Sequence, residues 1–304
     1  MATDEATPAK KATAKKATAR KATAKKAPAT NVQPPRAEDV LVEVEAAVDA
    51  EVEAQKSQGL DPVLAAYRLL RAYFRHELTG SEHVPAGGAL LVSNHSGGFM
   101  AMDLPLIASG LASGLGVKRR IVTLAHTAIF AGPWGAMFAK LGLIEATREA
   151  AHEALTSGEL TLVFPGGVHD VLRPTRDANV IDFAGRIGYV RTALEAGVPI
   201  VPVVSIGGQE TQLFLTRGEP IAELLRLDKL LRARAFPISI GFPFGISIGT
   251  PINIPLPAKI KTRILEPVDP AAFESPEETD VEVRRRMQEA IDEMADERRF
   301  PFLG

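Results

Sequence analysis

From Gly80 onward the chain alternates short apolar runs with stretches of helical periodicity, and this alternation limits its fold more than any other feature. The runs have the length and apolar character of buried strands. Strands separated by helices indicate an α/β sheet with substantial parallel pairing. We therefore predict an α/β domain over residues 59–304, with a mixed, largely parallel sheet flanked by helices. The predicted strands are residues 89–93, 121–124, 160–164, 199–206 and 237–240, and the predicted helices are residues 104–115, 150–156 and 185–196.

Two amphipathic patterns frame this alternation. The first predicts a helix over residues 60–78, where an apolar stripe lies beside three arginines: Leu60, Leu64, Tyr67, Leu70 and Phe74 with Arg68, Arg71 and Arg75. A basic amphipathic helix of this kind can lie in a membrane interface or pack on the domain core, and the sequence leaves both readings open. The second pattern predicts a surface helix over residues 280–297 that packs through Val283, Met287, Ile291 and Met294.

The first 36 residues differ in composition from the rest of the chain. They carry 9 Lys+Arg against 2 Asp+Glu, whereas residues 37–304 carry 26 against 35. Residues 10–28 repeat the unit Lys-Lys-Ala-Thr-Ala, in which no side chain is large enough to form a core. Burial cannot offset the ordering entropy of such a segment, so we predict a disordered basic tail over residues 1–36. Residues 37–58 are predicted to form an acidic linker or helix.

The spaced basic residues of this tail predict contact with an anionic surface. Lipid head groups and nucleic acid attract such residues by the same screened Coulomb force, so the sequence does not choose between these partners. A solubilising spacer is a third reading. No apolar stretch of signal-peptide length follows the charges, so we expect the tail to remain on the mature protein. One reading of the whole chain is a membrane-binding or nucleic-acid-binding protein with a catalytically inactive body.

Composition and spacing exclude several kinds of site. The chain has no cysteine, which excludes a disulfide framework, a thiolate nucleophile and any Cys-ligated metal. His126 and the pair His169-Asp170 lack a third ligand at a recognisable spacing, so we expect no metal. The uncharged stretches at residues 121–139 and 236–258 approach the length of a membrane span. Proline or glycine residues interrupt both stretches, so we expect no transmembrane helix.

The strongest candidate site is the block LLVSNHSGGFMAMDLP at residues 90–105. An apolar strand delivers Asn94 and His95 to its carboxyl end, the usual edge for sites in open α/β sheets. Asp103 is predicted to be the N-cap of the next helix. The glycines after Ser96 permit a turn tight enough to bring Asp103 back beside His95. Asp103 would then hold one imidazole nitrogen while the other acts as a general base, although a helix cap and a structural histidine would leave the same pattern.

Three further blocks carry candidate binding residues. In LVFPGGVHDVLRP, at residues 162–174, Gly166 and Gly167 follow a strand and let backbone N–H groups approach an anion closely. Arg148, in LGLIEATREA, and Arg173 can each meet a phosphate or carboxylate. The block GVPIVPVV reads as a buried strand whose prolines predict a sheet edge or a strand end. Residues 207–211 follow that strand and are expected at the same sheet edge as His95.

In this order, the four blocks resemble the glycerolipid acyltransferase superfamily, which contains the lysophosphatidate and glycerol-3-phosphate acyltransferases. The resemblance covers about residues 60–265. It implies that His95 and Asp103 stand for the family's His-(four residues)-Asp catalytic motif, here with seven residues between them. The third block usually reads Pro-Glu-Gly in the family, whereas this chain's FPGG looks more like the diacylglycerol acyltransferase-like branch. The substrate-binding residues that the resemblance implies are Asn94, Arg148, Gly166, Gly167 and Arg173.

The resemblance implies an O-acyltransferase. His95 is expected to remove the proton from a glycerolipid hydroxyl, which attacks the thioester of acyl-CoA or an acyl carrier protein while Asp103 orients the imidazole. The expected acceptor is a lysophospholipid such as 1-acylglycerol-3-phosphate, and a neutral mono- or diacylglycerol is the alternative. The thioester is a co-substrate, and no cofactor is expected. The implied location is cytoplasmic, peripherally associated with the inner face of the membrane.

A serine hydrolase is the weaker enzyme alternative. It needs Gly-x-Ser-x-Gly at a strand-to-helix turn, and we expect no such turn in this chain. Ser96 adjoins His95 in the sequence, which is a poor geometry for a nucleophile and its base.

Overall fold

The computed structural model describes residues 61–98, 100–114, 121–130, 135–227, 235–249 and 253–298. The chain divides into two units, Met1–Gln58 and Gly59–Gly304, and every described residue belongs to the second. The predictions of a disordered tail at residues 1–36 and of an acidic segment at residues 37–58 lie outside the described residues.

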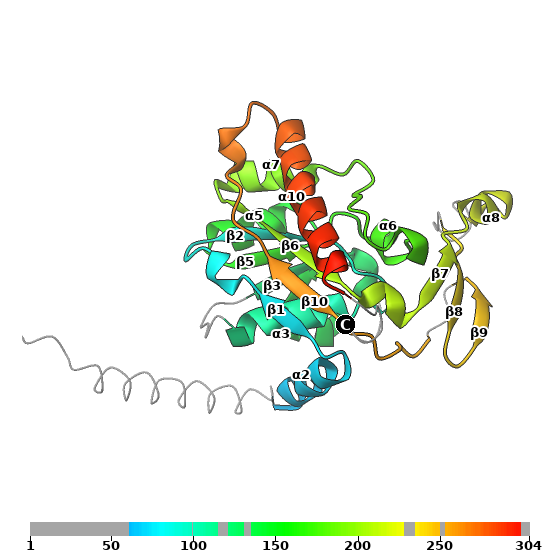
Figure 1. The fold of residues 1–304 in the computed structure, drawn as a ribbon. Helices are drawn as coiled ribbons and strands as arrows, with labels where there is room; N and C mark the ends of the chain where they lie inside the picture. Colours follow the sequence, from blue (N-terminus) through cyan, green and yellow to red (C-terminus); the bar gives the residue numbers. More distant parts are fainter. Residues whose placement is uncertain are drawn as a thin grey trace, which may run out of the picture. The chain divides into compact units, whose positions relative to one another are not determined.

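A seven-stranded mixed sheet forms the centre of the second unit (Figure 1). Its strands are β1 (Glu77–Thr79), β2 (Ala89–Ser93), β3 (Ile121–Ala125), β4 (Leu143–Glu145), β5 (Leu160–Val163), β6 (Ile200–Ile206) and β10 (Lys261–Ile264). Their order is β1-β10-β6-β2-β5-β3-β4. The five strands from β6 to β4 are parallel, whereas β10 is antiparallel to β6 and parallel to β1. The predicted α/β class, with a mixed and largely parallel sheet, is confirmed.

The prediction that residues 237–240 belong to this sheet is wrong. They form β8 (Ile238–Gly241), the middle strand of a separate antiparallel sheet with β7 (Leu213–Thr216) and β9 (Gly245–Ile248). Only a short turn separates β8 from β9, so the two pair locally as a hairpin. This second sheet lies to the right of the seven-stranded sheet in Figure 1.

Helices cover both faces of the large sheet, and strand β2 shows how the sequence achieves this. Ala89 and Leu91 pack toward α3 (Asp103–Gly114) on one face. Leu90 and Val92 belong to the cluster formed with α5 (Arg148–Thr156), α7 (Gly188–Ala196) and α10 (Pro276–Asp296) on the other. Because successive side chains of a strand alternate, a continuous apolar run is buried on both faces. The remaining helices are α2 (Asp61–Tyr73), α4 (Gly135–Lys140), α6 (Val168–Val171) and α8 (Glu219–Leu224), with 3-10 turns at Ser81–His83, Thr127–Ile129, Thr175–Asp177, Gly208–Thr211 and Pro270–Ala272.

Pro199 immediately precedes β6 (Ile200–Ile206), at a strand end as predicted, whereas Pro202 lies inside the strand and marks neither a sheet edge nor a strand end. The strand lies between β10 and β2, and all of its residues are buried. Pro202 accepts a hydrogen bond from Leu265 N on the β10 side, one residue beyond the end of β10. The N–H and C=O of a strand residue point to the same side of the strand. The side of Pro202 that lacks an N–H therefore faces Leu265, just beyond the end of β10, where the regular pairing of β6 with β10 ends. An interior strand therefore tolerates this proline.

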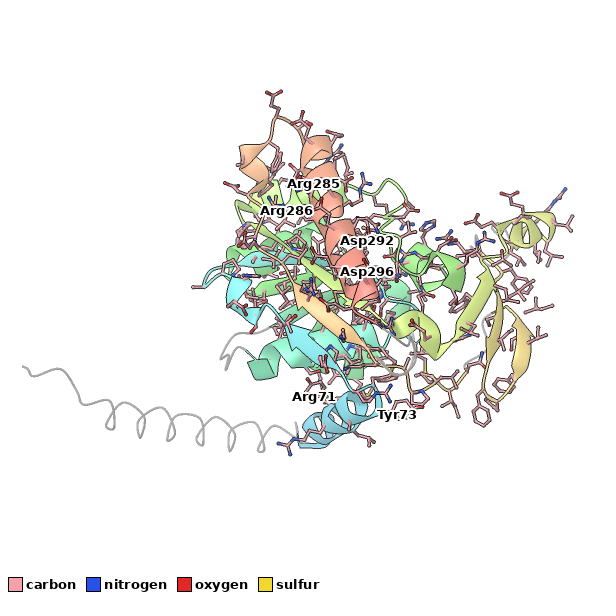
Figure 2. The ribbon with its side chains drawn as sticks, in the orientation of Figure 1. Arg71, Tyr73, Arg285, Arg286, Asp292 and Asp296 are labelled. Carbon is pink, nitrogen blue, oxygen red and sulfur yellow. The ribbon has the colours of Figure 1, made fainter. Side chains whose placement is uncertain are left out.

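Helix α10 matches its prediction closely. Ser275 accepts a hydrogen bond from Glu278 N and Pro276 is the first helical residue, so the helix begins with both an N-cap and a favoured proline. The predicted packing residues are all buried: Val283, Met287, Ile291 and Met294. Charged residues along the same helix include Arg285, Arg286, Asp292 and Asp296 (Figure 2).

Helix α2 is shorter than the predicted helix over residues 60–78. It ends at Tyr73 because Arg75 adopts a left-handed conformation with φ 44°, while Arg75 N donates to Ala72 O and His76 N to Arg71 O. These are the two bonds of a Schellman motif, which usually has glycine at the left-handed position. Tyr67 and Phe74 are buried with Leu106 and Ile260, so the described part of the apolar stripe, from Tyr67 onward, packs on the domain core. Figure 2 shows Arg71 and Tyr73 near the end of this helix.

Among the described residues, none of the helices is both long enough and apolar enough to cross a membrane.

We predict that His76 makes the fold sensitive to acid. Its Nε2 lies 3.1 Å from Thr262 Oγ1, and burial, aided by Arg71 and opposed by Glu77, lowers the pKa of His76 from 6.5 to about 4. Between these values the unfolded chain binds the proton first, so unfolding becomes easier as the pH falls. Between pH 7 and pH 5 this linkage should remove about 2 kcal/mol of stability, a loss that His76→Gln should avoid. Urea unfolding of both proteins at both pH values measures the difference, and equal losses would contradict the assignment.

Candidate active site

Three neighbouring strands bring the predicted blocks together at one sheet edge. Strands β6, β2 and β5 are adjacent and parallel, so their carboxyl ends lie side by side. Strand β2 delivers His95, β5 delivers the turn that contains Gly166, and β6 delivers residues 207–211. A Cβ on Gly97 would meet the Gln209 side chain at 2.3 Å, and one on Gly208 would meet Ser96 Oγ at 2.3 Å. The loops after β2 and β6 are therefore in close contact, as expected.

His95 and Asp103 are paired. Nδ1 of His95 lies 3.2 Å from Oδ2 and 3.3 Å from Oδ1 of Asp103. The side chain of Asp103 is fully buried and that of His95 is 10% exposed. Since a carboxylate accepts, Nδ1 carries the proton and Nε2 holds the free lone pair. Among the described residues Nε2 has no hydrogen-bond partner.

The loop between the two residues accommodates its extra length in a turn. Gly97 and Gly98 have φ of 106° and 80°, and Ala101, with φ 44°, donates its N–H to Gly98 O. Asp103 was predicted to be the N-cap, but it is the first residue of α3, so the helix begins one residue earlier than predicted. Its carboxylate accepts from Ser96 N at 2.7 Å and from Leu104 N at 2.9 Å. These bonds turn it toward the loop after β2, which explains how Asp103 reaches His95 across seven residues.

Asn94 has a different use from the predicted substrate contact. Its Nδ2 donates to Ser205 O and its Oδ1 accepts from Ser205 N, both at 2.9 Å. Asn94 is fully buried. The amide therefore closes a pair with the backbone of β6 and fixes the end of β2 from which His95 projects. The predicted contact of Asn94 with a substrate stays a prediction.

The turn after β5 holds a buried ion pair that sequence reasoning did not assign to this site. His95 N donates to Asp170 Oδ2 at 3.2 Å, and Nη2 of the buried Arg173 contacts Asp170 Oδ1. Burial raises the pKa of Asp170, against the opposing effect of Arg173 and His95. Arg173 was predicted to bind a substrate phosphate; its Nη2 contacts Asp170 and its side chain is 1% exposed, while its buried Nη1 has no hydrogen-bond partner among the described residues. The available signal was the i, i+3 spacing of the two residues after a Gly-Gly turn.

Gly166 and Gly167 shape this turn. A Cβ on Gly166 would lie 2.2 Å from Asp170 Cγ, so only glycine leaves room for that carboxylate. Gly167 has φ 50° and precedes α6. Arg186 Nη1 donates to the carbonyls of Pro165 and Gly166. The predicted anion contact by the backbone here stays a prediction.

Phe164 is a second residue that sequence reasoning missed. Its ring stacks on the imidazole of His95 with centroids 4.0 Å apart and planes 7° apart. Packing of this kind limits rotation of the imidazole and covers one of its faces. An aromatic residue at a strand end beside a Gly-Gly turn was the only sequence signal.

Arg148 lies apart from these contacts. It is exposed at the start of α5, after β4 at the edge of the sheet. Strand β4 is parallel to β2, so Arg148 is at the predicted sheet edge, with β5 and β3 between the two strands. Its role in binding an anionic group stays a prediction.

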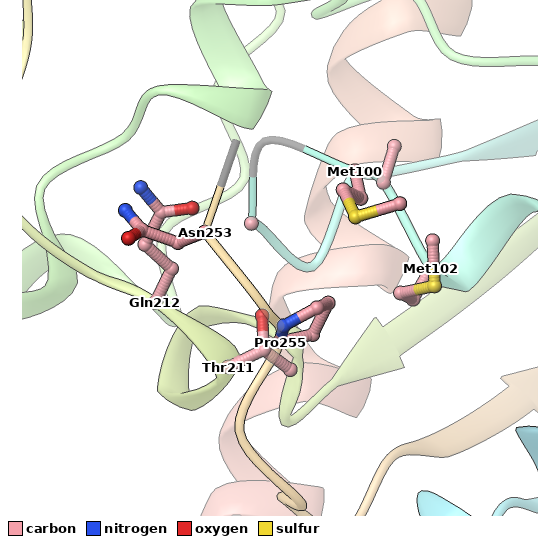
Figure 3. A pocket seen from close by; sticks show the side chains of 8 residues that line it. Met100, Met102, Thr211, Gln212, Asn253 and Pro255 are labelled. Carbon is pink, nitrogen blue, oxygen red and sulfur yellow. The ribbon is translucent and has the colours of Figure 1, made fainter. Parts of the chain in front are cut away.

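A narrow cleft opens beside the loop after β2 (Figure 3). Met100 and Met102 lie on one side, and Gln212 and Asn253 on the other. Gly98, Ala101, Thr211 and Pro255 complete its lining. Both polar atoms of the buried Asn253 side chain lack a hydrogen-bond partner among the described residues, as do those of Gln209 and the Oγ of Ser96. The lining of the cleft includes three uncharged polar residues, Thr211, Gln212 and Asn253.

The chain does contain one Gly-x-Ser-x-Gly sequence, at residues 245–249. The serine-hydrolase alternative requires this pattern at a strand-to-helix turn. Here Ser247 lies within strand β9, and its Oγ contacts Gly245 O at 3.3 Å. The pattern is therefore part of an antiparallel hairpin and not a nucleophile elbow.

Among the described residues, no three His, Cys, Asp or Glu side chains converge in a way that could hold a metal ion. His169, weighed above as a metal ligand, pairs instead with Asp182 at 2.8 Å.

Comparisons with known proteins place this chain among acyltransferase-like sequences. Residues 75–206 match the family model described as Acyltransferase. An uncharacterised protein of Mycobacterium tuberculosis is 31% identical over 244 residues, which cover 77% of this chain and 65% of that protein. The chain thus spans about two thirds of the length of this mycobacterial relative.

Two further similarities are to proteins with described functions. A Gallus gallus protein described as DGAT1/2-independent enzyme synthesizing storage lipids is 30% identical over 185 residues, covering 60% of this chain and 53% of that enzyme. The crystal structure of the 1-acyl-sn-glycerophosphate (LPA) acyltransferase PlsC from Thermotoga maritima aligns with 75% of this chain and 79% of its own, at 21% identity and a TM-score of 0.47.

We predict that Gly166→Ala destabilises the fold. The added methyl group would overlap the Asp170 carboxylate and push it away from His95 N, so the free energy of unfolding should fall by about 2 kcal/mol. Gly188→Ala is the matched control, because a Cβ there would meet nothing within 4 Å. Its stability should be unchanged or raised, by up to about 1 kcal/mol. Urea unfolding compares the two, and equal stabilities would contradict the close packing of Asp170 on Gly166.

Proposed function

We propose that this chain, whose residues 75–206 match the Acyltransferase family model, is a glycerolipid O-acyltransferase, which moves a fatty acyl group from a thioester to a glycerolipid hydroxyl. One observation carries the proposal: a buried carboxylate holds Nδ1 of His95, and Nε2 has no partner among the described residues. A histidine held in this way is suited to remove a proton from a hydroxyl.

In the proposed reaction His95 Nε2 takes the proton of the acceptor hydroxyl as its oxygen attacks the thioester carbonyl carbon. The C–O bond forms, the carbonyl oxygen gains negative charge, and the C–S bond then breaks. The leaving thiolate takes the proton back from the imidazolium, which regenerates neutral His95. Asp103 holds the imidazole orientation throughout and stabilises its charged form. No enzyme-bound acyl group is required.

Backbone N–H groups near His95 support this mechanism. Within the described residues, the N–H groups of Gly97 and Gly98 have no hydrogen-bond acceptor. They lie in the loop that follows His95, where an oxyanion would form. Preorganised donors aimed at developing charge contribute a large part of catalysis in acyl transfer. We assign the oxyanion-binding role to this pair in preference to Gly166 and Gly167.

The donor and the acceptor are proposed by class. Acyl-CoA or an acyl carrier protein supplies the thioester. A lysophospholipid such as 1-acylglycerol-3-phosphate is the leading acceptor, for which Arg148 is an exposed cation at the same sheet edge. A neutral mono- or diacylglycerol is the alternative, which gains support from the engagement of Arg173 by Asp170 and from the uncharged polar lining of the cleft. The reaction as written uses no cofactor.

We also propose that the protein works at an anionic membrane surface, peripherally and on its cytoplasmic side. The basic tail at residues 1–36 supports this through its 9 basic residues. Binding of the same tail to nucleic acid remains the alternative.

His95→Ala should lower acyl transfer by about 10³-fold, because the general base is lost. Asp103→Asn should lower it by about 10²-fold or more, because Nδ1–H loses its acceptor and the ring its orientation. His76→Gln is the control, since it changes another buried histidine near α2 and should keep near-normal turnover. Release of free thiol measures turnover, and circular dichroism checks the fold. A folded His95→Ala protein with near-normal turnover would overturn the mechanism.

The acceptor class is tested by acyl transfer from radiolabelled acyl-CoA to glycerol-3-phosphate, lysophosphatidate, other lysophospholipids, monoacylglycerol and diacylglycerol. If a phosphate is bound, Arg148→Gln should raise KM for lysophosphatidate by about tenfold and leave KM for monoacylglycerol unchanged. Activity on neutral acceptors alone would select the alternative acceptor class. Absence of transfer to all five acceptor classes would contradict the proposed function.

A further inference from the structure

In the hairpin of the small sheet β7-β8-β9, apolar side chains face outward and polar side chains face inward. Five apolar residues of its hairpin are exposed and form what we call the outer face: Ile240, Phe242, Phe244, Ile246 and Ile248. The last four of these are between 60% and 73% exposed. Ile240 is the register partner of Ile246 and Ile238 that of Ile248, so the apolar residues lie next to each other across the two strands. They therefore form a continuous apolar surface.

The opposite side of the same strands is polar. Ser239 and Ser247 are register partners and are both buried. Gln212 Nε2 donates to Ser239 Oγ at 3.1 Å, and the buried Asn253 side chain lies against Gly241. A sheet with one face in water normally alternates apolar residues inward and polar residues outward. This hairpin does the reverse, which favours an apolar phase outside it.

The hairpin lies in an uncharged segment, whereas the chain before it is basic. No charged residue occurs between Phe236 and Ala258, a segment that includes the whole hairpin. The chain from Arg226 to Arg234, which leads into β8, carries four basic residues and one acidic residue. An uncharged apolar hairpin that follows a basic stretch in the sequence is complementary to a lipid interface with anionic head groups.

The small sheet also borders the cleft. Gln212, which immediately precedes β7, and Asn253, which follows β9, both line the cleft beside Gly98 and Met100. The small sheet therefore joins the loop after β2, which carries His95, through the residues of this cleft.

We propose that the outer face of the β8-β9 hairpin is the surface by which this protein docks onto an anionic lipid bilayer. The proposal rests on the proposed function only in its activity test, while docking itself can be measured without catalysis. It gives the small sheet a role that packing within the described residues does not supply.

The test is sedimentation of the full-length protein with vesicles of equal parts phosphatidylcholine and phosphatidylglycerol. The outer-face variant is Phe242→Ser/Phe244→Ser/Ile246→Ser, whose side chains contribute little to folding because they are exposed. The matched control is Leu69→Ser/Val180→Ser/Val281→Ser, at positions 47% to 71% exposed on other parts of the unit. The vesicle partition coefficient should fall on the order of tenfold or more in the first variant and stay within about twofold in the control.

A second measurement does not depend on a loss of binding. In Phe244→Trp, tryptophan fluorescence should shift to the blue on vesicles and be quenched by brominated lipid, beyond the change in the unsubstituted chain. Unchanged partition of the outer-face variant, or Phe244→Trp emission that brominated lipid does not quench, would overturn the proposal. So would a dimer that becomes monomeric in the outer-face variant while its partition stays the same, since the face would then bind a second copy.

Activity separates this proposal from the proposed function. The outer-face variant should lose acyl transfer to an acceptor in vesicles and keep it toward a short-chain acceptor dispersed as monomers. Absence of transfer to both acceptors by the unsubstituted protein would contradict the proposed function and leave the vesicle result to decide docking.

Discussion

The buried carboxylate of Asp103 is the group on which the geometry of the candidate site depends. It accepts hydrogen bonds from Ser96 N and Leu104 N and pairs with Nδ1 of His95. Burial of such a polar group is costly unless its oxygens are satisfied, and here the loop after β2 and the start of α3 satisfy them. The same bonds that stabilise the loop therefore set the tautomer and direction of the imidazole. Removing this carboxylate would disturb the loop and the base together.

A second buried carboxylate, that of Asp170, lies against the loop that carries His95. The related family usually has Glu at the position of Gly166, and this chain has no side chain there. The Asp170 carboxylate fills that space, because a Cβ on Gly166 would lie 2.2 Å from Asp170 Cγ. Asp170 accepts a hydrogen bond from His95 N and contacts Arg173, so the turn after β5 holds the start of the loop after β2.

Sequence reasoning succeeded where one local signal determines the outcome and failed where the outcome depends on a partner far along the chain. The strand at residues 89–93 and the packing face of α10 follow from apolar spacing alone. The His95–Asp103 pair was predictable because a glycine turn joins its members. In contrast, Arg173 looked like an anion ligand until Asp170 was placed beside it, and Asn94 looked free until Ser205 was placed opposite. The end of α2 was missed because Arg75 occupies a position where glycine is usual.

The uncharged stretch at residues 236–258 approaches the length of a membrane span. Its prolines and glycines exclude a membrane-spanning helix, and its place in an antiparallel hairpin keeps its isoleucines out of the core. Single exposed apolar residues need no explanation, but several adjacent ones on a face whose opposite side is polar do. Water would favour the serines outside and the isoleucines inside, and a register shift of one residue would achieve this. The fold instead keeps Ser239 and Ser247 inward, beside the cleft, so the arrangement gains stability only if the outer face leaves water.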